Sequence, residues 1–125
     1  MKENDLSYII RGCNFKVYYN LGSGLLESVY EAALAHELRR MGLNVRTQVP
    51  VPVVYEGEHL ELGFRLDVLV NDAIIVEIKS IEGLLDVHHK VVITYLKLTG
   101  KKLGLLVNFN TDNISGSIVR KVNNL

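Results

Sequence analysis

Residues 64–80 constrain the fold of this chain more than any other stretch. They contain two runs rich in β-branched residues, 64–70 and 74–80, which are separated by the turn-forming sequence Asn-Asp-Ala. Two such runs on either side of a short polar break predict a β-hairpin. We therefore expect the rest of the chain to pack around two adjacent antiparallel strands.

Strict alternation along this hairpin assigns each side chain to one of two faces. One face is purely aliphatic and consists of Leu66, Val68, Val70, Ile74, Val76 and Ile78. The opposite face then carries Asp67, Glu77 and Lys79. A two-residue turn would place Asp67 opposite Val76, so the pattern needs a three-residue loop at 71–73 or a bulge. Two carboxylates and a lysine are thus predicted to share one patch of sheet.

The two carboxylates on this patch call for a compensating charge. Like charges that face each other across two strands are destabilising. A divalent cation would offset that cost, because it prefers carboxylate and carbonyl oxygens. Lys79 could then hold a water molecule or a phosphate oxygen beside the metal. The same residues also fit an ordinary solvent-exposed sheet face on which Lys79 neutralises Glu77.

Size and charge narrow the classes of function. A chain of 125 residues fits one domain, which we place at residues 1–125, and can bury a substantial core. Fourteen basic and fourteen acidic residues give a formal net charge of zero. This balance argues against a general polyanion-binding protein, which is usually basic overall, but it leaves room for a local basic patch.

Cysteine content and apolar runs indicate the compartment. The single cysteine, Cys13, excludes an internal disulfide and suits a reducing cytosol. No apolar run approaches the length of a membrane span. The opening sequence Met-Lys-Glu-Asn-Asp is not typical of a signal peptide. We therefore expect a cytoplasmic protein that does not insert into a membrane.

Three helices are predicted from apolar spacings of three and four residues, over 4–20, 25–41 and 86–99. Glycines follow the second and third of these segments and are suited to end a helix. The last segment, 117–122, fits either a short strand or a short helix.

Further strands complete a predicted mixed sheet. Extended segments are expected at 45–49 and 51–55, where Pro50 and Pro52 favour a sheet edge or a bend. The continuous apolar run at 103–109 is typical of a strand covered on both faces. A helix between the hairpin and this strand predicts a parallel crossover onto the same sheet. The expected architecture is a single α/β domain with a mixed sheet and helices on both faces.

Several short motifs follow one another along this framework. They are Gly24-x-x-Glu27-x-x-Tyr30, Gly63-Phe64-Arg65-x-Asp67, Glu77-Ile78-Lys79, Tyr95-Leu96-Lys97 and Gly104-Leu105-Leu106-Val107-Asn108-Phe109. In this order and spacing, they resemble the GxxExxY protein family, a branch of the PD-(D/E)XK nuclease superfamily. The resemblance covers about residues 6–122. It implies a restriction-endonuclease-like fold and metal-dependent hydrolysis of phosphodiester bonds in DNA or RNA.

The resemblance also implies a role for each matching residue. Asp67 and Glu77 resemble the aspartate and glutamate that bind the catalytic metal, Mg²⁺ or Mn²⁺, with the Ile78 carbonyl as a third ligand. Lys79 resembles the lysine that orients the attacking water and stabilises charge on the phosphate. Glu27 resembles the acid on a helix that completes such catalytic and metal sites.

The helix predicted at 86–99 contains a departure from the family. Val91 stands where relatives often carry a glutamine, which motivates an alternative function: a catalytically degenerate module of the same fold that binds nucleic acid or protein. His88 either faces the site or is a half-exposed histidine near the helix start, and Asp86 is the expected N-cap.

An acidic site repels phosphate groups, so a nucleic acid would need nearby cations. The candidates are Arg65 on the hairpin, Lys90 and Lys97 two helical turns apart, and Lys101 just beyond the helix. The same lysines also fit an ordinary solvated helix face. The partner expected is DNA or RNA, and a chain this small could form a homodimer to grip a duplex.

Overall fold

The computed structural model describes residues 1–60 and 63–125. Its helices and strands are, in chain order, α1 (Glu3–Leu21), α2 (Glu27–Arg40), β1 (Val45–Pro50), β2 (Val53–Tyr55), β3 (Glu58–Leu60), β4 (Arg65–Val70), β5 (Ile74–Lys79), α3 (Asp86–Thr99), β6 (Leu103–Asn108), the 3-10 helix η1 (Ile114–Ser117) and β7 (Ile118–Val122). No helix in this described part of the chain is long and apolar enough to span a membrane.

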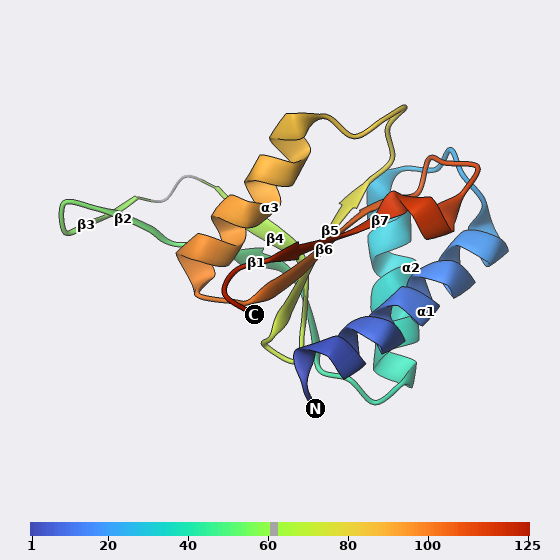
Figure 1. The fold of residues 1–125 in the computed structure, drawn as a ribbon, viewed down its shortest axis with the longest axis horizontal. Helices are drawn as coiled ribbons and strands as arrows, with labels where there is room; N and C mark the ends of the chain where they lie inside the picture. Colours follow the sequence, from blue (N-terminus) through green and yellow to red (C-terminus); the bar gives the residue numbers. More distant parts are fainter. Residues whose placement is uncertain (61–62) are drawn as a thin grey trace.

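Five strands form one mixed sheet in the order β1-β4-β5-β6-β7. β5 and β6 run parallel, and the other neighbouring strands are antiparallel. α1 and α2 cover one face of this sheet and α3 covers the other, whereas the β2–β3 hairpin extends away from the body of the molecule (Figure 1). The α/β fold with a mixed sheet and helices on both faces is therefore confirmed.

Each face of the sheet has its own apolar core. The larger core lies under α1 and α2 and includes Leu6, Ile10, Tyr30, Leu34, Val68, Val70, Ile74, Val76, Ile78, Leu105 and Phe109. The smaller core lies under α3 and consists of Val49, Val51, Leu66, Leu69, Ile75, Val92, Leu96 and Leu106. A Cβ at Gly104 would lie 2.9 Å from Val92 Cγ1, so this glycine allows α3 to pack closely on β6.

The predicted elements are largely confirmed. The third helix has the predicted bounds, β6 pairs with β5 in parallel, and β1, which ends at Pro50, lies at the sheet edge. The undecided C-terminal segment is a strand that follows one 3-10 turn.

The second helix begins two residues later than predicted, because Tyr30 holds the preceding loop in a non-helical conformation. Its hydroxyl donates to the Gly22 carbonyl (2.6 Å) and accepts the Leu25 N–H (3.1 Å), while its ring stacks on Phe109. Tyr30 is therefore packed between helix and sheet. Gly24 of the motif lies in the loop with φ of +91° and not on the helix.

The β4–β5 hairpin has the predicted three-residue loop, since Val70 pairs with Ile74. One part of the predicted face pattern is wrong. Val68 and Val70 face α1 and α2, but Leu66 belongs to the core under α3. The strand changes faces because its pairing with β1 is interrupted at Asp67, opposite Gln48, whose φ is +52°. Sequence alternation does not reveal such an interruption.

Candidate active site

The carboxylates of Asp67 and Glu77 lie where regular pairing between β4 and β5 ends. The last regular pair is Val68 with Val76. One residue further on, the Asp67 N–H donates to Glu77 Oε1 (3.1 Å), and the Ile78 N–H donates to Asp67 Oδ2 (2.8 Å). Each strand thus gives an N–H group to the carboxylate of the other strand. These reciprocal bonds hold both carboxylates in fixed orientations on a rigid part of the sheet.

Glu77 is unusual because it is an acidic residue in the interior, with 5% of its surface exposed. Burial, and then the negative charge of Asp67, raise the pKa of Glu77 to about 9. The positive charge of Lys79 acts in the opposite direction but is outweighed. The interpretation as an ordinary solvent-exposed face is therefore wrong for Glu77. At neutral pH this carboxyl group holds a proton unless another positive charge replaces it.

Glu27 approaches the pair from the start of α2. Its Oε2 accepts the N–H of Ser80 (3.1 Å), and the Ser80 hydroxyl donates to the Leu25 carbonyl (2.6 Å). These two bonds join the start of α2 to the end of β5. As a result Glu27, Asp67 and Ile78 line one small pocket of about 140 Å³. The structure thus brings Glu27 to the sheet patch, as expected.

Three further polar residues line this pocket and were not predicted from the sequence, Ser28, Glu31 and Gln48. The Gln48 amide donates to Glu31 Oε1 (2.5 Å). Burial, together with the charge of Asp67, raises the pKa of Glu31, although the Gln48 hydrogen bond lowers it. The spacing of four residues from Glu27 could have identified Glu31. Gln48 carries no comparable local signal, because its position depends on the interrupted pairing with β4.

Lys79 and Tyr95 lie near the carboxylates of Asp67 and Glu77, and Lys79 forms no ion pair with either of them in the described part of the chain. The ion pairs found among residues 1–60 and 63–125 do not include Lys79. Burial, followed by the charges of Glu77 and Asp67, raises the pKa of the Tyr95 hydroxyl. The ring of Tyr95 packs edge-on against Phe64, with 6.2 Å between the ring centroids. The α3 side of the site is therefore aromatic as well as acidic.

The carboxylate oxygens at the site are of the kind that hard divalent cations bind. Asp67 and Glu77 supply two carboxylates, and a cation between them would offset both the repulsion and the burial that disfavour ionised Glu77. In the described part of the chain, no three or more acidic, histidine or cysteine side chains are grouped closely enough to hold a metal by themselves. Mg²⁺ typically binds one or two carboxylates and takes its remaining ligands from water and phosphate, so two carboxylates suffice.

The four predicted nucleic-acid-binding residues differ in their position relative to the site. Lys90 lines a small pocket with Phe64 and Tyr95, next to the site. The Arg65 guanidinium donates to the Gln48 carbonyl (3.3 Å) on the neighbouring strand. Lys97 is exposed two turns further along α3. Lys101 lies at the other end of the sheet, where its Nζ is 3.1 Å from Asp72 Oδ1 in the β4–β5 loop.

The start of α3 is capped differently from the prediction. Asp86 is the first helical residue and not the N-cap. Instead His88 Nδ1 accepts the N–H of Leu85 (2.8 Å). His88 is thus the half-exposed histidine near the helix start, and it caps the helix. Val91 is 37% exposed and lines the pocket beside Lys90 and Tyr95, where it offers no polar group.

A scan against protein-family models matches residues 4–121 to the PD-(D/E)XK nuclease superfamily. The match therefore includes each of the motifs noted in the sequence, although it does not test the GxxExxY branch, which stays a prediction. Neither a search of curated proteins nor a search of solved structures gives a match. Members of this superfamily are generally nucleases that depend on divalent metals. With its fold, its paired carboxylates and a match over nearly its whole length, the chain belongs to the PD-(D/E)XK nuclease superfamily.

Proposed function

We propose that the chain hydrolyses phosphodiester bonds of DNA or RNA with Mg²⁺ or Mn²⁺, using Asp67, Glu77 and Lys79 as the core of the site. The observation that carries this proposal is the reciprocal hydrogen bonding of Asp67 and Glu77. It places the buried carboxylate of Glu77 beside the half-buried carboxylate of Asp67, where ionised Glu77 is costly without a cation. A purely structural hairpin would gain stability from apolar residues at these positions.

Each residue then has a definite task. Asp67 and Glu77 would hold the cation, together with the Ile78 carbonyl, and Glu27 would complete the acidic surround from α2. When bound, the metal would stabilise the negative charge that develops on the phosphate and make a bound water more acidic. Glu77 would release its proton as the cation binds, since ligands bind metals in their deprotonated form. Lys79 would orient the attacking water and stabilise charge on the phosphate.

Cleavage of labelled single- and double-stranded DNA and RNA in Mg²⁺ and Mn²⁺ tests this function. We expect cleavage that EDTA abolishes and that Glu77→Ala and Lys79→Ala each reduce at least about a hundredfold. Glu58→Ala on β3 and Lys102→Ala before β6 are the matched controls, because both residues are exposed and lie away from the site. Cleavage that persists in both site variants would exclude the assignment.

Val91 favours a second candidate of a different class, a binding module that no longer catalyses. Its exposed apolar side chain stands beside the site where the resemblance implies a glutamine. Calorimetric titration with Mn²⁺ distinguishes the two functions. Binding that is lost in Asp67→Ala supports the nuclease. The absence of binding at millimolar Mn²⁺, with nucleic acid still bound, supports the module.

A further inference from the structure

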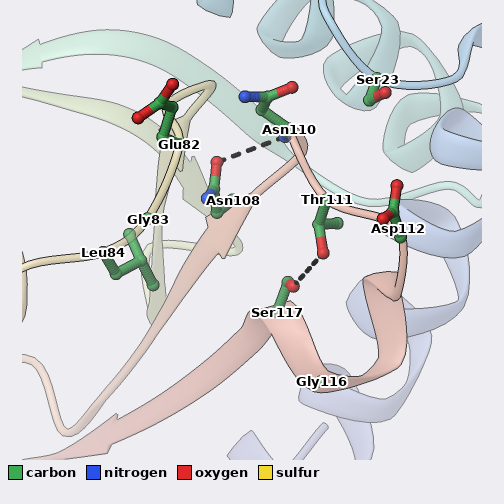
Figure 2. A pocket seen from close by; sticks show the side chains of 10 residues that line it. All are labelled: Ser23, Glu82, Gly83, Leu84, Asn108, Asn110, Thr111, Asp112, Gly116 and Ser117. Carbon is green, nitrogen blue, oxygen red and sulfur yellow. Dashed lines mark hydrogen bonds between the residues drawn. The ribbon is translucent and has the colours of Figure 1, made fainter.

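A second and larger cavity lies beyond the ends of the parallel strands β5 and β6. It has a volume of about 450 Å³ and is formed by the loops that follow these two strands, with Ser23 from the α1–α2 loop on its rim (Figure 2). Crevices outside the carboxyl ends of parallel strands are common ligand sites in α/β proteins. This volume is within the range of small-molecule pockets.

The floor of the cavity is held rigidly by Asn108. Its side chain accepts the N–H groups of Ile81 (3.1 Å) and Asn110 (3.3 Å) and donates to the Ile81 carbonyl (3.0 Å). On the far wall the hydroxyl of Ser117 contacts that of Thr111 (2.8 Å), as Figure 2 shows. These bonds join both loops, so the cavity does not need to be ordered by a ligand.

Polar groups on the rim remain available. In the part of the chain that the structure describes, the side chains of Ser23, Glu82, Asn110 and Asp112 make no hydrogen bond or ion pair with one another or with their neighbours. Figure 2 shows Glu82 on the loop after β5, Asp112 on the loop after β6, and the Asn110 amide between them in that view. The rim thus offers two carboxylates, one amide and one hydroxyl.

This cavity adjoins the candidate active site. Asn108 is the register partner of Lys79 on the neighbouring strand, and adjacent strands lie about 4.8 Å apart. Ser80, directly after Lys79, is bonded to Leu25 and Glu27, two and four residues beyond Ser23. A polymer that places one phosphate at Lys79 would therefore bring a neighbouring unit to the cavity.

The lining excludes phosphate as the occupant. It contains no lysine or arginine, and its two carboxylates repel anions. The part of a nucleic acid that carries no charge is the nucleoside, whose amino and hydroxyl groups can donate to Glu82, Asp112 and Asn110. We propose that the cavity binds the nucleoside next to the cleaved phosphate, an inference that rests on the proposed nuclease function.

The same chemistry predicts which base is preferred. Adenine and cytosine each present an amino donor beside a ring-nitrogen acceptor, which suits the combination of carboxylates and the Asn110 amide. Uracil presents a carbonyl oxygen at the corresponding position, which the carboxylates repel. The cavity therefore binds adenosine and cytidine more tightly than uridine.

Titration of the whole, isotope-labelled protein with free adenosine, cytidine and uridine tests this inference by NMR. In EDTA, so that no cleavage or metal binding contributes, we expect the signals of the Asn110 amide and of Gly83 and Gly116 to shift with adenosine and cytidine. Uridine is expected to bind at least about fivefold more weakly, since one good pair of contacts discriminates by about 1–3 kcal/mol. Equal shifts with all three nucleosides would overturn the proposal. So would the absence of shifts at the cavity at nucleoside concentrations up to about 10 mM.

Variants locate the binding and separate it from the nuclease proposal. Asn110→Leu should weaken adenosine binding about tenfold, and Glu82→Gln with Asp112→Asn should remove most of the preference over uridine. Asn44→Leu is the matched control, because Asn44 is exposed at the opposite end of the sheet. Binding that survives Asn110→Leu and the acid variants unchanged refutes the cavity as the site. Nucleoside binding without any cleavage supports the cavity and refutes only the nuclease.

Discussion

The two ends of the β4–β5 hairpin are built on opposite principles. At the loop end, Val68, Leu69 and Val70 pair regularly with Val76, Ile75 and Ile74, and all six side chains are buried and aliphatic. At the other end the β1–β4 pairing is interrupted, and carboxylates replace backbone partners. The regular end stabilises the sheet and leaves no polar group free. The irregular end contributes less to stability, and it places acidic groups where a cation and a phosphate can reach them.

The largest difference should appear when apolar volume is removed from the regular end. Ile75 is fully buried under α3, so Ile75→Ala should lower the free energy of unfolding by about 2–5 kcal/mol. Chemical denaturation followed by circular dichroism measures this loss. Mn²⁺ affinity of the folded protein should change little. A variant that loses Mn²⁺ binding but not stability would contradict the division between the two ends.

The irregular end should make the stability of the folded protein depend on pH. Glu77 has a pKa of about 9 when folded, against 4.5 as the ordinary value, so between these values the folded state binds more protons than the unfolded state. Its contribution to stability is therefore fully present below about pH 4.5 and is lost as pH rises toward 9. The loss is at most about 1.4 kcal/mol per pH unit.

Denaturation at pH 6 and pH 8 in EDTA measures this contribution, with Glu77→Gln as the comparison. The variant keeps a similar shape but cannot ionise, so its stability should fall by about 2 kcal/mol less than that of the parent over this interval. A parallel fall in both proteins would mean that Glu77 does not carry the extra proton. Replacing EDTA with Mn²⁺ should restore stability to the parent and not to the variant.

The same contrast explains how far the sequence predicts the structure. Helices and strands with regular apolar spacing, such as α3 and β6, depend on local patterns and were predicted within one or two residues. The three-residue loop followed from matching Asp67 with Glu77, and the crossover followed from a helix between two strands. Regular elements are predictable because each residue repeats the same local rule.

What the sequence could not supply depends on tertiary contacts. Alternation placed Leu66 with Val68, but the interruption at Asp67 and Gln48 puts them on opposite faces. The burial of Glu77 and the pairing of Lys101 with Asp72 likewise depend on segments far apart in the chain. Asp67 and Glu77 nevertheless stand out in the sequence, because an acid in an apolar run conflicts with the local pattern. Such conflicts are expected at functional sites.

A smaller effect should separate two neighbouring positions on β1. Gln48 has φ of +52°, a backbone conformation that glycine adopts without strain, whereas Thr47 pairs regularly with Val68. Thr47→Gly should therefore cost about 1 kcal/mol of stability. Gln48→Gly should change stability by less than about 0.5 kcal/mol, because relief of strain offsets the lost hydrogen bond to Glu31. Equal losses at both positions in thermal denaturation would argue against the interruption.

The smallest effect concerns how three lysines contribute to the salt dependence of nucleic-acid binding. The contribution of each lysine should decrease with its distance from the site at the irregular end. Lys90 lies beside Phe64 and Tyr95, Lys97 is about 10 Å further along α3, and Lys101 is paired at the loop end. If phosphates pass the irregular end, Lys90→Ala should lower the slope of log affinity against log salt by about 0.7–0.9 unit, Lys97→Ala by less and Lys101→Ala by nothing measurable. Binding of a labelled oligonucleotide to the Glu77→Ala protein across a salt series measures these slopes.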